Sequence, residues 1–320
     1  MIKRVLVTGA AGFIASHLIE LLLSKGISVI GVDNFDPFYD RKLKEQNLAV
    51  LRKAGGVKFS FYELDIEQKE SLERITESFD AVLHIAGKAG VRPSIDNPPG
   101  YIGSNITGTQ NILDFMKEKS CKKLVFASSS SIYGNTKKVP FSEDFQVDHP
   151  ISPYAFTKKA NELQIHTYHH LFDIDSVCLR FFTVYGPRQR PDLAIRKFFT
   201  LIMEDKAIDM YGDGTTGRDY TFVSDIVAGI FGALNYVNDN ANVYEIVNIG
   251  NNSPVMLHKM IHTIYKACNK TPNINKLPMQ AGDVEITYAD TSKAERLFGY
   301  KPKVSFKEGI NEFKNWLNTQ

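Results

Sequence analysis

The chain has 320 residues, with 38 Lys and Arg side chains against 36 Asp and Glu side chains, which gives a formal net charge of +2. Hydrophobic residues make up 43% of the chain and charged residues 23%, a composition typical of a soluble globular protein. These values exclude a disordered or collagen-like chain. The chain has no long basic block, so no nucleic-acid partner is expected, and no apolar run approaches the roughly 20 residues of a membrane span.

The three cysteines, Cys121, Cys178 and Cys268, are far apart in the sequence and form no C-x-x-C pair. This usage predicts neither a disulfide framework nor a metal site. Because free thiols are typical of a reducing compartment, we expect a cytoplasmic protein.

Short β-rich runs alternate with helical patterns in the first half of the chain. The predicted strands are Arg4–Thr8, Ser28–Asp33, Lys58–Glu63, Ala81–His84, Lys123–Ala127 and Ser176–Arg180. The predicted helices are Gly12–Lys25, Lys42–Ala54, Gln68–Glu77, Ile102–Lys119 and Pro153–Phe172. This alternation is typical of βαβ units, so the sequence predicts an α/β fold, a Rossmann-type doubly wound parallel sheet.

Shorter elements and more loops follow Arg180. We therefore predict a Rossmann domain over residues 1–180 and a smaller C-terminal α/β domain over residues 181–320. No segment near the boundary resembles a flexible linker, which leaves open that later segments return to the first sheet.

A glycine-rich loop joins the first predicted strand to the first predicted helix. Gly9, Gly12 and Ala15 have the spacing G-x-x-G-x-x-A. Glycines let the backbone turn tightly and approach a pyrophosphate, whose charge is stabilised at the helix N-terminus. Alanine is acceptable at the third position, which serves helix–strand packing. The loop predicts a dinucleotide site that includes Phe13 and Ile14.

Asp33 ends the second predicted strand, where a carboxylate can accept hydrogen bonds from an adenosine ribose. It would repel a 2′-phosphate, so we expect NAD rather than NADP as the cofactor, bound by residues 1–180. Asp65 and Ile66 follow the third strand, where they either hold the adenine or form a solvated turn. His84, which ends the fourth strand, is predicted to be a hydrogen-bonded core residue rather than a catalyst. Further candidate cofactor contacts in these loops are Asn34, Ala86 and Lys88.

Tyr154 and Lys158 are separated by one helical turn, so a phenol and an ammonium can reach the same point. A nearby cation favours the phenolate, which makes the tyrosine usable as a base near neutral pH. The serine-rich segment 128–131 ends a predicted strand upstream, and its hydroxyls can bind a substrate oxygen.

The glycine loop, Asp33, the serine strand and the Y-x-x-x-K pair, in this order, resemble the extended short-chain dehydrogenase/reductase family, and in particular its nucleotide-sugar epimerases. The resemblance spans essentially the whole chain. It implies a catalytic set of Ser129, Tyr154 and Lys158. Tyr154 would exchange a proton with the sugar, Lys158 would bind the nicotinamide ribose and lower the tyrosine pKa, and Ser129 would orient the sugar hydroxyl.

The same resemblance indicates the reaction. Relatives that eliminate water carry Asp-Glu at the positions of Ser130 and Ser131, and decarboxylating relatives carry a glutamate at the position of Ser131. Without these carboxylates, a sugar oxidised at C4 can only regain its hydride. We therefore expect a 4-epimerase, an isomerase of nucleotide sugars, with NAD retained throughout.

Thr183 and the following Arg-Pro-Asp-Leu-Ala of residues 190–194 resemble UDP-glucuronate 4-epimerases, as does the Ala-Gly-Val-Arg segment that ends at Arg92. Hydroxyls of Ser130, Ser131 and Thr183 would then bind the sugar carboxylate. The family pattern also implies that Arg190 and Arg218 hold the pyrophosphate of UDP, and that Asp283 meets the uridine ribose or one of these arginines. This places the nucleotide sugar on residues 181–320.

Two other functions are left open at this point. One is a 4-epimerase of UDP-N-acetylglucosamine or its uronic acid, since motifs do not reveal pocket size. The other is a non-catalytic NAD(H)-binding regulator, which the intact Ser129, Tyr154 and Lys158 argue against. Family members commonly dimerise through two helices per subunit, so we expect a homodimer formed by residues 102–119 and 153–172.

Overall fold

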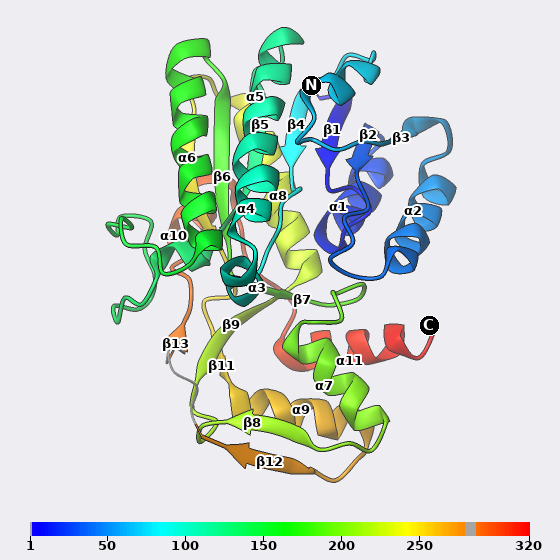
Figure 1. Ribbon diagram of the computed structural model, residues 1–320, viewed down its shortest axis with the longest axis vertical. Coiled ribbons are helices and arrows are strands. Elements are labelled where there is room, and N and C mark those ends of the chain that lie inside the picture. Colours follow the sequence, from blue (N-terminus) through cyan, green and yellow to red (C-terminus); the bar gives the residue numbers. More distant parts are fainter. Residues whose placement is uncertain (1, 279–285) are drawn as a thin grey trace.

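The computed structural model describes residues 2–278 and 286–320 (Figure 1). Its centre is a parallel sheet of seven strands in the order β10-β6-β5-β4-β1-β2-β3. The strands are β1 (Arg4–Thr8), β2 (Ser28–Asp33), β3 (Phe59–Glu63), β4 (Ala81–His84), β5 (Lys123–Ser129), β6 (Asp175–Phe181) and β10 (Tyr244–Ile249). This doubly wound order confirms the predicted Rossmann-type sheet.

Helices cover both faces of this sheet. One face carries α1 (Phe13–Ser24), α2 (Arg41–Gly55) and α8 (Val223–Asp239), and the other carries α5 (Gly108–Glu118) and α6 (Pro153–Phe172). The central strands are buried on both sides, which explains their continuous Val, Leu and Ile runs. Within the described residues, no helix is both long and apolar enough to cross a membrane.

The predicted bounds of β1, β2, β4 and α6 are confirmed, but two predicted helices differ. Residues 68–77 form only a 3₁₀ turn, η2 (Lys69–Arg74), which buries a single residue, Leu72, and ends at Ile75, whose backbone is extended. Residues 102–119 start as a π-helical turn, η3 (Ile102–Thr107), which follows the short α4 (Pro98–Tyr101) and leads into α5. The π turn places Asn105 beside the site described below.

A smaller lobe lies at the carboxyl ends of the parallel strands (Figure 1). It contains β7 (Thr183–Tyr185), β8 (Ile208–Tyr211), β9 (Gly217–Phe222), β11 (Pro254–Met256), β12 (Ile274–Leu277), β13 (Ile286–Thr287), α7 (Ala194–Met203), α9 (Leu257–Cys268) and α11 (Phe306–Leu317). Strand β10 pairs with β6, and α10 (Ser292–Phe298) packs against α8 and β10. Segments after residue 180 thus return to the first sheet, and the division at residue 180 stays a prediction.

A fully buried polar network joins α6 to strands β5, β6 and β10. The Arg180 guanidinium donates two hydrogen bonds of 2.9 Å to the Glu162 carboxylate and one of 2.9 Å to the Tyr133 hydroxyl. Tyr133 in turn donates to Asn248 Oδ1 at 2.7 Å, and Ser128 Oγ donates to Glu162 at 2.8 Å. Arg180 and Glu162 are 1% and 0% exposed, so their charges are compensated within the protein, Glu162 by Arg180 and, at 3.8 Å, by the Lys159 ammonium.

Replacing Arg180→Met should lower the free energy of unfolding by about 3–5 kcal/mol, because it leaves the buried Glu162 carboxylate with only the more distant, partly exposed ammonium of Lys159. Urea unfolding followed by circular dichroism measures the loss. The control is Arg41→Met, which removes exposed ion pairs to Glu45 and Glu63 and should change the stability much less, because water screens these charges. Equal losses in the two variants would contradict the role of the buried network.

Candidate functional site

A cavity of about 870 Å³ lies where the parallel strands end and the smaller lobe begins. Loops after β1, β2, β4 and β5 line it, together with the N-terminal part of α6 and residues around β7 and β9. The sequence-predicted site residues that line it are Gly9, Gly12, Phe13, Ile14, Asp33, Asn34, Ile66, Ala86, Lys88, Arg92, Ser129, Ser130, Ser131, Tyr154, Lys158, Thr183, Arg190 and Arg218. Thus one cavity joins the predicted cofactor and substrate residues.

Two predicted residues are not in this set. Asp65 does not line the cavity; its carboxylate accepts hydrogen bonds from Asn34 Nδ2 at 3.2 Å and from the Glu67 amide at 2.9 Å. Of the two alternatives predicted for Asp65, these contacts favour a residue that forms the turn over one that holds the adenine. Asp283 lies outside the described residues.

The glycine loop is shaped for a phosphate group. Gly9 has a φ of +70°, and a Cβ there would lie 3.0 Å from the Ala86 backbone. Gly12 is the N-cap of α1 and offers no side-chain cap, and the first turn has no acidic residue. The first-turn amides, beginning at Phe13, therefore lack side-chain acceptors at the cavity wall. Backbone donors and the positive helix end fit the pyrophosphate of a dinucleotide.

Asp33 is held at the end of β2 by two backbone amides. Its carboxylate accepts hydrogen bonds from Ala11 N at 3.1 Å and Phe35 N at 2.8 Å. Burial raises the pKa of Asp33, and the ammonium of Lys44, 3.9 Å away, is the strongest influence in the opposite direction. Lys44 also lines the cavity and was missed by sequence reasoning. The available signal was its spacing of four and seven residues from Leu48 and Leu51, which places it on the apolar face of this helix.

The segment after β4 is clamped by Asn105 of the π turn. Asn105 Oδ1 accepts from Lys88 N at 2.8 Å, and Asn105 Nδ2 donates to Lys88 O at 3.0 Å and to Thr157 Oγ1 at 2.9 Å. The Lys88 ammonium forms an ion pair with Asp36 from the loop after β2. Sequence reasoning missed Asn105, because an asparagine within a predicted helix carries no signal of this contact.

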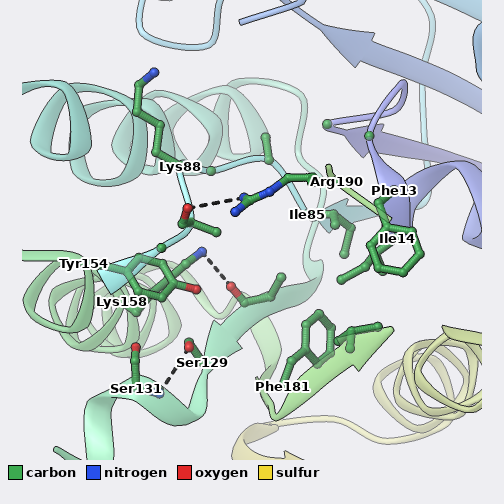
Figure 2. Close-up of a pocket in the computed structure, with 18 of the residues that line it drawn as sticks. Phe13, Ile14, Ile85, Lys88, Ser129, Ser131, Tyr154, Lys158, Phe181 and Arg190 are labelled. Atoms are coloured by element: carbon green, nitrogen blue, oxygen red, sulfur yellow. Dashed lines mark hydrogen bonds between the residues drawn. The ribbon is translucent and has the colours of Figure 1, made fainter. Parts of the chain in front are cut away.

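Tyr154, Lys158 and Ser129 meet in one part of the cavity (Figure 2). Helix α6 starts at the Ser152 N-cap, whose hydroxyl accepts from Ala155 N at 3.1 Å, with proline at the first helical position. Lys158 Nζ donates to the Ala127 carbonyl at 2.8 Å and lies 4.7 Å from the centre of the Phe126 ring. The start of α6 and the end of β5 therefore place the three groups.

The pKa of Tyr154 differs from the sequence-based expectation. Burial raises the Tyr154 pKa, while the Ser129 hydroxyl and the charge of Arg190 lower it by less. Lys158 was expected to depress the tyrosine pKa, but in this structure burial outweighs the nearby charges. Burial also lowers the pKa of Lys158 to about 8. The cavity thus favours the uncharged forms of both groups.

Hydroxyl groups gather opposite the cofactor loop. Ser129 Oγ accepts from Ser131 N at 3.1 Å, which starts the short helical turn η4 (Ser130–Tyr133). Ser131 Oγ is buried and has no hydrogen-bond partner among the described residues. Thr183 is exposed to the cavity at the start of β7. These hydroxyls can receive a polar group of a ligand.

Arginine side chains border the cavity on the side of the smaller lobe. Arg190 donates to the Ala89 carbonyl at 3.2 Å, binds Asp192 through two nitrogens, and lies 4.8 Å from the centre of the Phe38 ring. Arg218 donates to the Gly217 carbonyl at 2.9 Å. Planar guanidinium groups at a cavity wall are suited to phosphate oxygens.

Comparisons with known proteins agree with this geometry. Residues 6–313 match the family described as GDP-mannose 4,6 dehydratase. The UDP-glucuronate 4-epimerase of Thermodesulfobacterium geofontis is 44% identical, over 97% of this chain and 95% of that protein.

Solved structures of two epimerases cover the whole fold. The UDP-glucuronic acid 4-epimerase of Bacillus cereus, in complex with UDP-glucuronic acid and NAD, aligns with a TM-score of 0.90 and 35% identity over 99% of both chains. The UDP-N-acetylglucosamine 4-epimerase of Methanobrevibacter ruminantium aligns with a TM-score of 0.89 and 28% identity over 99% of both chains. The chain therefore belongs to the extended short-chain dehydrogenase/reductase family, among its NAD-dependent nucleotide-sugar enzymes.

Proposed function

We propose that this protein is a NAD-dependent UDP-sugar 4-epimerase that interconverts UDP-glucuronate and UDP-galacturonate. The observation that carries the proposal is a single cavity that joins the glycine loop and Asp33 to Tyr154, Lys158 and Ser129. The relatives in Thermodesulfobacterium geofontis and Bacillus cereus support both the reaction and the sugar.

The chain's own residues would handle the proton. The glycine loop and Asp33 would hold NAD, which would supply the acceptor for the C4 hydride and the donor for its return to the opposite face of the sugar. Tyr154 takes the proton of the C4 hydroxyl as the C4–O bond becomes a carbonyl, and gives it back when the hydride returns. Lys158, fixed on the Ala127 carbonyl, supplies positive charge beside the phenol, and Ser129 orients the sugar oxygen. No net oxidation of the sugar results.

The distribution of carboxylates favours epimerisation over elimination. Among the described residues that line the cavity, the only carboxylates are Asp33 and Asp36, in the loop at the adenosine side. Ser130 and Ser131 stand where dehydratases of the family carry an acid and a base. A 4-keto sugar in this cavity would therefore lack the general acid and base that loss of water requires.

The hydroxyls of Ser130, Ser131 and Thr183 would bind the sugar carboxylate. The buried Ser131 Oγ, without a hydrogen-bond partner among the described residues, is suited to donate to an anionic oxygen. Arg190 and Arg218 would hold the UDP pyrophosphate, and Arg92 would border the sugar. Asp283 is proposed to contact the uridine ribose or one of these arginines.

A 4-epimerase of UDP-N-acetylglucosamine or its uronic acid is the second candidate. The fold similarity to the Methanobrevibacter ruminantium enzyme favours it. A regulator that only binds NAD(H) would not need Tyr154, Lys158 and Ser129 at one point, so we place it third.

We also propose a cytoplasmic homodimer. The cysteines of the described residues are free, as expected in a reducing compartment. Helix α6 exposes large apolar side chains on its outer face, namely Phe156, Leu163 and Leu171, which are 45%, 57% and 59% exposed. Burying these side chains against a second copy of α5 and α6 would remove them from water.

The function is tested by incubating the protein separately with UDP-glucuronate, UDP-glucose and UDP-N-acetylglucosamine and identifying the products by NMR. We expect UDP-galacturonate from the first. Tyr154→Phe should lower kcat at least about 100-fold, because it removes the proton-transferring group. A UDP-pentose product would instead show decarboxylation, and turnover of the acetamido sugar alone would support the second candidate.

Thr183→Ala should lower kcat/KM for UDP-glucuronate about tenfold, the loss expected for one hydrogen bond to a charged group. Turnover of a neutral UDP-sugar, where measurable, should change little. Thr183→Ser keeps the hydroxyl and serves as the matched control. Equal losses on the charged and the neutral sugar would show that Thr183 does not recognise the carboxylate.

Leu163→Glu should convert the dimer into a monomer, because it places a charge in the centre of the proposed apolar contact. Light scattering after size-exclusion chromatography measures the mass. Val57→Glu is the control, since Val57 is fully exposed beyond the end of α2, away from α6. A wild-type protein that elutes as a monomer at micromolar concentration would contradict the proposed dimer.

A further inference from the structure

His84, at the end of β4, is buried beneath the cofactor side of the cavity and does not line it. Both of its ring nitrogens make hydrogen bonds. Nδ1 lies 2.6 Å from Thr8 Oγ1 on β1, and Nε2 lies 3.0 Å from Thr109 Oγ1 on α5. The imidazole therefore connects the neighbouring strand to a helix on one face of the sheet.

The hydrogen bonds around Thr8 guide the assignment of the ring proton. Thr8 Oγ1 accepts a hydrogen bond from Ala86 N at 3.1 Å. Among the described residues, the only hydrogen-bond partner for the hydroxyl hydrogen of Thr8 is Nδ1 of His84. The proton of the neutral imidazole is therefore assigned to Nε2, which donates it to Thr109, so that Nδ1 accepts from Thr8.

Burial keeps this imidazole neutral. It lowers the pKa of His84 to about 3, and the charge of Lys158 acts in the same direction. At neutral pH the Nδ1 lone pair is therefore available to Thr8, and the ring adds no positive charge beside Lys158. The ring also packs against Phe126, with 5.5 Å between the two ring centres.

Ala86, whose amide donates to Thr8, lines the cavity. Ala86 touches the cofactor loop so closely that a Cβ on Gly9 would lie 3.0 Å from its backbone. The next residue, Gly87, approaches the catalytic side, since a Cβ there would lie 3.2 Å from Lys158 Nζ. A shift of Ala86 would thus change the spacing between the glycine loop and Lys158.

We propose that His84 is a positioning residue for the cofactor: its Nε2–H tautomer orients the Thr8 hydroxyl, which holds the Ala86 amide and thereby fixes the cavity wall between Gly9 and Lys158. The effect on NAD passes through Thr8 and Ala86, because His84 itself does not reach the cavity. This inference rests on the proposed binding of NAD in this cavity and is independent of which sugar is the substrate.

A matched pair of variants separates the two ring nitrogens. His84→Asn places an amide oxygen near the position of Nδ1 and can still accept from Thr8, whereas His84→Gln places its amide near Nε2 and loses that acceptor. The enzyme loaded with radiolabelled NAD is diluted into excess unlabelled NAD without any sugar, and the release of label is followed. The melting temperature of each variant is measured alongside.

We expect His84→Gln to release NAD at least about tenfold faster than the wild type and His84→Asn to stay within about threefold. Both variants should lower the melting temperature, because His84→Gln loses the contact with Thr8 and His84→Asn loses the contact with Thr109. Equal release rates in the two variants, or rates that simply follow the melting temperatures, would overturn the proposal. If His84 contributed only to the stability of the core, the release rates would follow the melting temperatures.

Thr8→Val keeps the test decisive if a His84 variant does not fold. It removes the hydroxyl at nearly constant shape, so it should speed NAD release as much as His84→Gln, and the two substitutions combined should add little further. Thr109→Val, on the far side of the ring, should have the smaller effect. Unchanged release from Thr8→Val would overturn the inference alone, whereas a wild-type protein that binds no NAD would overturn the proposed function as well.

Discussion

The parallel register of β1 with its two neighbours is the constraint on which the site depends. Thr8, the last residue of β1, pairs with Val32 of β2 and with His84 of β4. The three loops that follow therefore leave the sheet side by side at one edge, where polar backbone groups are available. Backbone hydrogen bonds set this register. The glycine loop, Asp33 and Ala86 therefore come together without needing large side chains to pack them against one another.

The other half of the site depends on the position of α6 against β5. Ser128, the neighbour of Ser129, donates to Glu162 of α6, and Arg180 of β6 binds the same carboxylate. This buried network lies in the same region as Lys158, whose pKa the charge of Glu162 raises slightly against the larger effect of burial. The groups that hold α6 in place thus also contribute to the electrostatics of the proposed proton transfer.

Burial makes charge unfavourable at the centre of the cavity. It raises the pKa of Tyr154 and lowers that of Lys158, so neither residue alone creates a phenolate at neutral pH. A tyrosine base in such a place requires additional positive charge, which an oxidised nicotinamide ring carries. The physical expectation is that proton transfer and cofactor binding are coupled in this site.

The sequence by itself determined the alternation of strands and helices, the glycine loop and the Y-x-x-x-K pair, because these depend on local spacing along the chain. It could not predict the return of β10 to the sheet, the 3₁₀ turn of residues 69–74 or the clamp at Asn105, since each follows from contacts between distant segments. The upward shift of the Tyr154 pKa was decided by tertiary structure for the same reason. Spacing shows that a cation can reach a phenol, but only the folded chain determines how much water both have lost.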